Sequence, residues 1–181
     1  MKYLTYSGNH LINAKLPDNS EIYYAQPAKP GVSRAEIPEH LKKAVENPLG
    51  MPPLKELVNG NSKLLIAFDN NCQPFPMTKK PDMRQIMLET LLPLLYSYGV
   101  AKNNIQLICA GGLHRKMKTP ELAYMLGRKI MSEFYPYQLR NFDAEDRDNI
   151  VDLGKTGQDE IVEVERAVVE SDLVILSLIH I

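Results

Sequence analysis

The sequence predicts an α/β protein of three layers, a Rossmann-like parallel sheet with helices on both faces, preceded by an irregular proline-rich β segment. A short continuous apolar run at 63–68 has the composition of a strand buried on both faces, and a second strand is predicted at 104–110. A polar or glycine-rich loop and then a segment with helical periodicity follow each of these strands. A further apolar run begins at Leu173. Strands and helices that alternate in this way favour a parallel sheet.

Residues 1–60 are expected to form a β and loop segment that packs on the core. Apolar and polar residues alternate over residues 1–16 and are interrupted at Gly8, a pattern that predicts a strand or hairpin. A short helix is predicted at 37–46. Ser33 is a candidate cap for its start, and the Asn-Pro pair at 47–48 predicts its end.

Residues 61–175 are expected to form the α/β domain. The helix after the first apolar run ends at Gly99, and the helix after the second is expected to be capped by Thr119, with Pro120 as its first residue. The remaining elements predicted in order are a helix at 81–98, a helix from 120 to about 134, strands at 150–153 and 157–164, a helical turn at 165–170 and a buried strand from 173.

The composition argues against nucleic-acid and membrane partners. The 181 residues are 44% hydrophobic and 24% charged, with a formal net charge of -1, so the chain lacks the basic surface that nucleic acids or anionic membranes attract. No apolar run is long enough to span a bilayer, and no basic-then-apolar leader follows Met1. Two cysteines provide neither a disulfide framework nor metal-binding spacing. We expect a cytoplasmic protein.

The first candidate site loop, residues 69–76, begins with Asp69 directly after a predicted strand. In open α/β sheets ligands bind beyond the carboxyl ends of the strands, so this loop could receive the hydroxyls or phosphate of a nucleotide. The alternative is that Asp69 caps a turn, because aspartate side chains often accept hydrogen bonds from nearby backbone amides.

The second candidate loop contains His114, four residues beyond the predicted strand and after two glycines. The glycines would let the backbone approach a ligand closely, and a neutral imidazole there could act as a general base near neutral pH. The alternative is an ordinary surface histidine. The two glycines lack the third that a dinucleotide fingerprint requires, and the acidic run 143–148 lacks the spacing of a calcium loop, so we predict no metal site and a solvated loop there.

Taken in order, several segments resemble the lactate racemase (LarA) family. The resemblance extends over about residues 45–175 and rests on an ordered set. Its members are Asn-Pro-Leu-Gly at 47–50, the aspartate-led loop closing with Pro-Phe-Pro at 74–76, Gly-Leu-His-Arg at 112–115, Thr-Pro-Glu at 119–121, Asn-Phe-Asp at 141–143, Leu-Gly-Lys-Thr at 153–156 and Ser-Asp-Leu-Val-Ile at 171–175.

The resemblance implies racemisation or epimerisation of a 2-hydroxy acid with a nickel-pincer nucleotide, a modified pyridinium mononucleotide. In the family a histidine takes the hydroxyl proton while hydride moves from the substrate carbon to the pyridinium ring and then returns to the opposite face. His114 matches the first catalytic histidine. The loop residues that match the cofactor-contacting segment are Asp69, Asn70, Asn71, Cys72 and Gln73.

The chain departs from the family in two places. The family loop carries an arginine that suits a substrate carboxylate, whereas Cys72 or Gln73 stands in its neighbourhood here, so we expect a hydroxy acid other than lactate or a polyol-like compound. The resemblance also places a second histidine, the cofactor lysine and a nickel-ligating histidine after residue 175. We therefore expect this chain to be truncated and inactive alone.

The last six residues, 176–181, are the direct translation of CTG TCT CTT ATA CAC ATC, a transposon-end adapter used in preparing sequencing libraries. We therefore expect the sequence to be non-native from Leu176 onward, and His180 is given no role. The alternative is a natural apolar strand.

Two other functional classes remain as alternatives. A nucleotide-binding α/β transferase or dehydrogenase would use the same two loops around a common dinucleotide. A non-catalytic ligand-binding module would not need His114 as a base.

Overall fold

The computed structural model describes residues 1–23, 31–71 and 80–177, and the chain divides into two compact units, Met1–Gly31 and Val32–Ile181. The first unit contains an antiparallel hairpin of β1 (Lys2–Ser7) and β2 (His10–Lys15), with Gly8 in the left-handed conformation at its turn. The predicted hairpin is therefore present. Its packing on the sheet stays a prediction, as does the non-native origin of residues 176–181.

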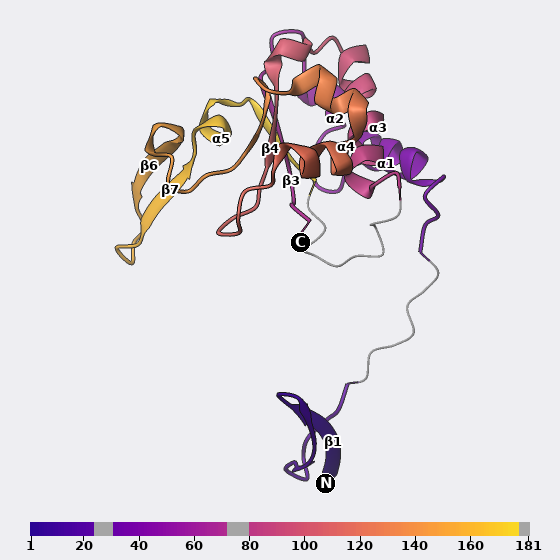
Figure 1. Cartoon of the computed structure of the whole chain (residues 1–181), viewed down its shortest axis with the longest axis vertical. Coiled ribbons are helices and arrows are strands. Elements are labelled where there is room, and N and C mark those ends of the chain that lie inside the picture. The colour runs from indigo at the N-terminus through magenta and orange to yellow at the C-terminus, as the bar shows by residue number, and fades with distance from the viewer. Residues whose placement is uncertain (24–30, 72–79, 178–181) are drawn as a thin grey trace. The chain divides into compact units, whose positions relative to one another are not determined.

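The second unit is built on a four-stranded parallel sheet in the order β5-β4-β3-β8 (Figure 1). This sheet, with its helices, confirms the predicted α/β fold class. Phe68 at the end of β3 pairs with Cys109 of β4 and with Ser177 of β8, so these strands end at the same edge of the sheet. The strands are β3 (Leu64–Phe68), β4 (Ile105–Cys109), β5 (Leu139–Asn141) and β8 (Leu173–Ser177).

Strand β3 is buried along its whole length because it lies in the interior of the sheet with a covered face on each side. Successive side chains of a strand point to opposite faces. Leu64, Ile66 and Phe68 accordingly join the larger apolar cluster, while Leu65 joins a smaller one on the other face. The continuous apolar run in the sequence reflects this two-sided burial.

The larger cluster is formed by helices α1 to α4, which gather on one side of the sheet (Figure 1). Leu88, Leu92 and Leu95 of α3 and Leu126 and Ile130 of α4 are each at most 2% exposed. The bounds are α1 (Ile37–Glu46), α2 (Leu54–Leu57), α3 (Met83–Ser97) and α4 (Thr119–Phe134), with a short 3-10 turn, η2 (Lys102–Asn104), leading into β4.

The opposite face is covered by Ala167 of α5 (Arg166–Glu170), next to an antiparallel hairpin of β6 (Ile150–Lys155) and β7 (Ile161–Glu165). A 3-10 turn, η3 (Arg147–Asn149), precedes the hairpin. The buried Glu165 accepts two hydrogen bonds from Arg140 of β5, at 2.6 and 3.0 Å, and also caps α5 through the Ala167 amide. This bidentate pair attaches the hairpin to the edge of the sheet.

Two predicted helix caps are wrong. The residue before α1 is Glu36, and its carboxylate accepts a hydrogen bond from the Ser33 amide rather than Ser33 capping the helix. The residue before α4 is Lys118, so Thr119 is already helical. The Lys118 amide donates to the Glu121 carboxylate at 2.7 Å, so Glu121, and not Thr119, is the side chain that satisfies a backbone amide at the start of this helix.

Glu121 also forms a bidentate ion pair with Arg115, at 2.6 and 2.7 Å. The Arg115 hydrogen bonds first, and the Lys118 amide second, lower the pKa of Glu121 from 4.5 to about 2. A carboxyl whose pKa falls on folding stabilises the fold above its unfolded pKa, and the contribution disappears as the pH falls toward the folded pKa.

We expect Glu121→Gln to remove this part of the acid dependence. The difference in free energy of unfolding between wild type and variant should be largest above about pH 5 and should shrink toward about pH 2.5. Urea denaturation across this range measures it, with the exposed Glu160→Gln as the control. A difference that stays constant with pH would contradict the role given to Glu121.

Candidate functional site

The candidate site lies at the carboxyl edge of the parallel sheet. Asp69 and Asn70 follow β3, and the loop 110–118 follows β4. Strand order runs from β3 through β4 to β5 and then returns to β8 on the other side of β3, so it reverses at β3. Such reversal points are where open α/β sheets bind ligands. The structure thus places the start of the first predicted loop, residues 69–71, and the whole of the second at the expected edge.

Arg84 fixes the start of the first loop. This residue lies in the first turn of α3 and is only 5% exposed. Its guanidinium donates two hydrogen bonds to Asp82, at 2.8 and 2.9 Å. Another guanidinium nitrogen donates to the carbonyl of Asn70 at 2.5 Å and to that of Asp69 at 3.3 Å, and lies 3.6 Å from the Asp69 carboxylate. One buried side chain therefore fixes the backbone that leaves β3.

Charge pairing keeps this guanidinium ionised despite its burial. Burial disfavours the charged form, but the hydrogen bonds that Arg84 donates to Asp82 and the charges of Asp82 and Asp69 outweigh it and raise the pKa of Arg84. Asp82 also accepts from the Arg84 amide at 2.9 Å and so caps α3. The sequence analysis missed this pair. The signal was present as an aspartate directly before a helix, two residues from an arginine in its first turn.

The two loops meet at Asn70 and His114. The side-chain nitrogen Nδ2 of Asn70 lies 3.2 Å from Nδ1 of His114. Asn70 is 6% exposed, whereas His114 is exposed. A buried amide thus holds one nitrogen of the ring, which leaves Nε2 as the nitrogen for a ligand.

Both glycines before His114 have a geometric reason. A side chain at Gly111 would place its Cβ 3.1 Å from Nδ2 of Asn70, a tight contact that would displace the Asn70 amide by a few tenths of an ångström. Gly112 has open space around it but a φ of +56°, a conformation that L residues rarely adopt. The two glycines were predicted to let the backbone approach a ligand. In the structure, Gly111 lets the backbone approach Asn70.

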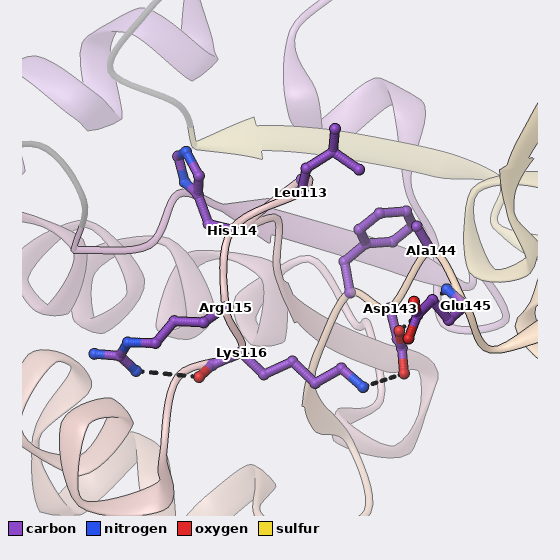
Figure 2. Close-up of a pocket in the computed structure, with 9 residues that line it drawn as sticks. Leu113, His114, Arg115, Lys116, Asp143, Ala144 and Glu145 are labelled. Atoms are coloured by element: carbon purple, nitrogen blue, oxygen red, sulfur yellow. Dashed lines mark hydrogen bonds and ion pairs between the residues drawn. The ribbon is translucent and has the colours of Figure 1, made fainter.

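A cavity of about 350 Å³ lies on the outer side of the second loop (Figure 2). Residues 112–116 line it together with residues 142–145, which follow β5. Lys116 reaches across to Asp143, and this bond raises the pKa of Lys116 and lowers that of Asp143. In Figure 2 the ring of His114 leaves the loop in a different direction from the Lys116 side chain.

The acidic run was predicted to be a solvated loop, yet Asp143 and Glu145 line this cavity. The sequence analysis missed their position because β5, the strand before them, is three residues long and carries no readable periodicity. Among the other predicted cofactor residues, Asn71 is exposed beside Asn70, and Cys72 and Gln73 lie outside the described residues.

Other features of the described residues bear on cofactors and location. Within 1–23, 31–71 and 80–177, no group of three or more His, Cys, Asp or Glu side chains could hold a metal ion. Cys109 is buried at the end of β4, with its sulfur 3.7 Å from that of Met117. None of the helices in these ranges has the length and apolar character needed to cross a bilayer.

The fold and this edge define an open α/β protein with a candidate ligand site at the carboxyl ends of its strands. The chain belongs to the family described as lactate racemase N-terminal domain, whose model matches residues 7–179. This match confirms the resemblance found in the sequence.

One curated relative agrees with this assignment, and two solved structures share the fold. Lactate racemase of Thermoanaerobacterium thermosaccharolyticum is 26% identical over 140 residues, which are 75% of this chain and 29% of that protein. The structure of the lactate racemase apoprotein from the same organism matches with a TM-score of 0.59 at 22% identity, over 97% of this chain and 38% of that one. A crystal structure of a Thermotoga maritima protein matches with a TM-score of 0.52 at 19% identity, over 80% and 33%. The chain thus spans 29% of the curated relative's length.

We expect Arg84→Ala to lower the free energy of unfolding by about 3–5 kcal/mol, because it leaves Asp82 and two loop carbonyls without their buried partner. Arg84→Lys should recover only part of this loss, since a lysine cannot reproduce the forked donation. Denaturant unfolding measures both. The exposed Arg128→Ala is the matched control, with an expected change within about 0.5 kcal/mol. Equal stability of Arg84→Ala and the control would refute the anchoring role of Arg84.

Proposed function

We propose that this chain is the N-terminal part of a longer LarA-like racemase or epimerase that acts on a 2-hydroxy acid. The observation that carries the proposal is the position of His114, exposed at the carboxyl edge of the sheet and held at Nδ1 by Asn70, in a chain that belongs to the lactate racemase N-terminal family. A cytoplasmic location is part of the same proposal.

His114 would act as the base that takes the substrate hydroxyl proton at Nε2. A hydroxyl bound within hydrogen-bond reach of a neutral imidazole nitrogen can lose its proton as the hydrogen on the adjacent carbon departs with its electron pair. In the reverse direction the protonated ring would return the proton. Because the ring is exposed while its other nitrogen is held, a substrate can reach Nε2 without displacing Asn70.

The proposed cofactor is a nickel-pincer nucleotide in the complete protein, which when bound would accept and return the hydride. The described residues fit a nucleotide at this edge, because the Asp69–Asn70 backbone is fixed by Arg84 and the glycine loop after β4 lies beside it. Residues 69–73 would contact the nucleotide. The nickel ligand and the attachment lysine are proposed to belong to the longer polypeptide.

The proposed substrate is a 2-hydroxy acid or related compound other than lactate. The loop 69–76 contains no arginine, and the Arg84 guanidinium, which contacts the start of this loop, is buried and engaged with Asp82 and the carbonyls of Asp69 and Asn70. An arginine so engaged cannot also grip a substrate carboxylate with two parallel hydrogen bonds. A panel of single-enantiomer 2-hydroxy acids and sugar acids, followed by chiral chromatography, would identify the substrate.

We expect His114→Gln in the complete, cofactor-loaded protein to lower kcat by about 10²–10⁴-fold, the range for loss of a general base. Arg128→Ala, on the exposed side of α4, should leave kcat unchanged. Substrate deuterated at the carbinol carbon should keep its deuterium, because the hydrogen moves as hydride and does not exchange with water.

Two results would count against this proposal. Full turnover by His114→Gln would favour the non-catalytic reading of His114, and release of the deuterium into water would point to proton abstraction from carbon instead of hydride transfer. Saturable binding of NAD or S-adenosylmethionine by the wild-type chain, lost on substitution at residues 69–71, would favour the dehydrogenase or transferase alternative.

A further inference from the structure

We infer that Asn70 is a positioning residue that decides which nitrogen of His114 carries the proton, and that the orientation seen here is a resting state in which Nε2 is protonated. The inference rests on the proposed role of His114 as a base. It names a group that acts on the base through Nδ1, the nitrogen away from the substrate, and that does not itself take or return the substrate proton.

The argument begins with the chemistry of the contact. Nδ2 of Asn70 faces Nδ1 of His114 at 3.2 Å, and an amide nitrogen carries only hydrogens to donate. With the amide in this orientation Nδ1 accepts, and it then carries no proton. In a neutral imidazole the proton then lies on Nε2. A ring in this form presents a donor to a ligand and cannot take a hydroxyl proton at Nε2.

Both states that a base passes through need the opposite arrangement. A neutral ring with a bare Nε2 carries its proton on Nδ1, and a ring that has just accepted the substrate proton carries protons on both nitrogens. In each case Nδ1–H requires an acceptor. The Asn70 side chain supplies one after a half-turn about its Cβ–Cγ bond, which exchanges Oδ1 and Nδ2 at nearly unchanged positions.

The surroundings restrict Asn70 to this role. Asn70 is 6% exposed, and Arg84 donates a hydrogen bond to its backbone carbonyl at 2.5 Å, so the residue is held in position. Gly111 leaves room for the amide, since a Cβ there would lie 3.1 Å from Nδ2. The backbone of Asn70 is held while its amide faces the ring, and we therefore expect the orientation of the amide and the position of the proton on His114 to change together.

The test reads the proton position directly by nuclear magnetic resonance of the intact chain labelled with ¹⁵N-histidine. The four histidines give separate ring spectra, and His114→Gln identifies the signals of His114. At alkaline pH, where imidazole is neutral, a nitrogen that carries a proton and a bare nitrogen have well-separated chemical shifts. We expect the wild type to show a bare Nδ1 and a protonated Nε2.

Asn70→Asp is the decisive variant. A carboxylate can only accept, so the proton should move to Nδ1 and the two nitrogen shifts should exchange. Asn71→Asp is the matched control, because it adds the same charge one residue further along at an exposed position. The proton should stay on Nε2 in this control. A proton that remains on Nε2 in Asn70→Asp, or that moves equally in both variants, would overturn the inference.

A second variant keeps the test decisive if the new carboxylate disturbs folding. Gly111→Ala pushes a methyl group against the amide without adding charge. It should bring both His114 nitrogen shifts toward the average of a ring that exchanges its tautomers, with the backbone amide spectrum otherwise retained. Shifts identical to those of the wild type would also overturn the inference. Since no turnover is measured, failure here leaves the proposed racemase activity standing, and the reverse holds as well.

Discussion

The candidate site depends on one buried interaction, the contact of the Arg84 guanidinium with Asp82 and the two carbonyls that follow β3. A charged group this deeply buried is stable only when its hydrogen-bonding capacity is used, and here it joins a helix start to a strand end. Asn70 is thereby fixed in backbone position, and through Asn70 so is the ring of His114. The positions of Asn70 and His114 therefore depend on Arg84, a buried residue that is not itself accessible to a ligand.

The sequence allowed much of the fold to be predicted because β3, β4 and β8 are apolar on both faces and stand out as short continuous runs. Strand β5 escaped prediction since three residues are too few to show a period. The strands at 150–155 and 161–165 were expected, but their antiparallel pairing outside the sheet was not, because pairing partners are not encoded in local composition. The wrong caps at Ser33 and Thr119 reflect competition from glutamates at Glu36 and Glu121.

The sequence predicted which residues lie at the site but not how their side chains contact one another. Asp69, Asn70 and His114 follow from the rule that parallel strands present their carboxyl ends at one edge. That Asn70 contacts the ring of His114, and that Gly111 leaves room for the Asn70 amide, depends on the register of β3 with β4. Register is fixed by the packing of whole strands, so it lies beyond what two loop sequences can specify.

The pairing of β3 with β8 has a consequence for how the chain reaches its native state. Lys63, just before β3, donates its amide to the carboxylate of Asp172, which lies 109 residues further along. During synthesis from the N-terminus, β3 and β4 can pair before β8 exists, and one apolar strand edge then stays open while the chain from Cys109 to Leu173, about a third of the sequence, is made. Contacts so distant in sequence form slowly because a long loop must close first. The reversal of strand order beside β3, where the site lies, is thus completed only when β8 has paired. Nascent chains that stall between β5 and β8 would expose an unpaired apolar strand edge, to which chaperones or other nascent chains could bind.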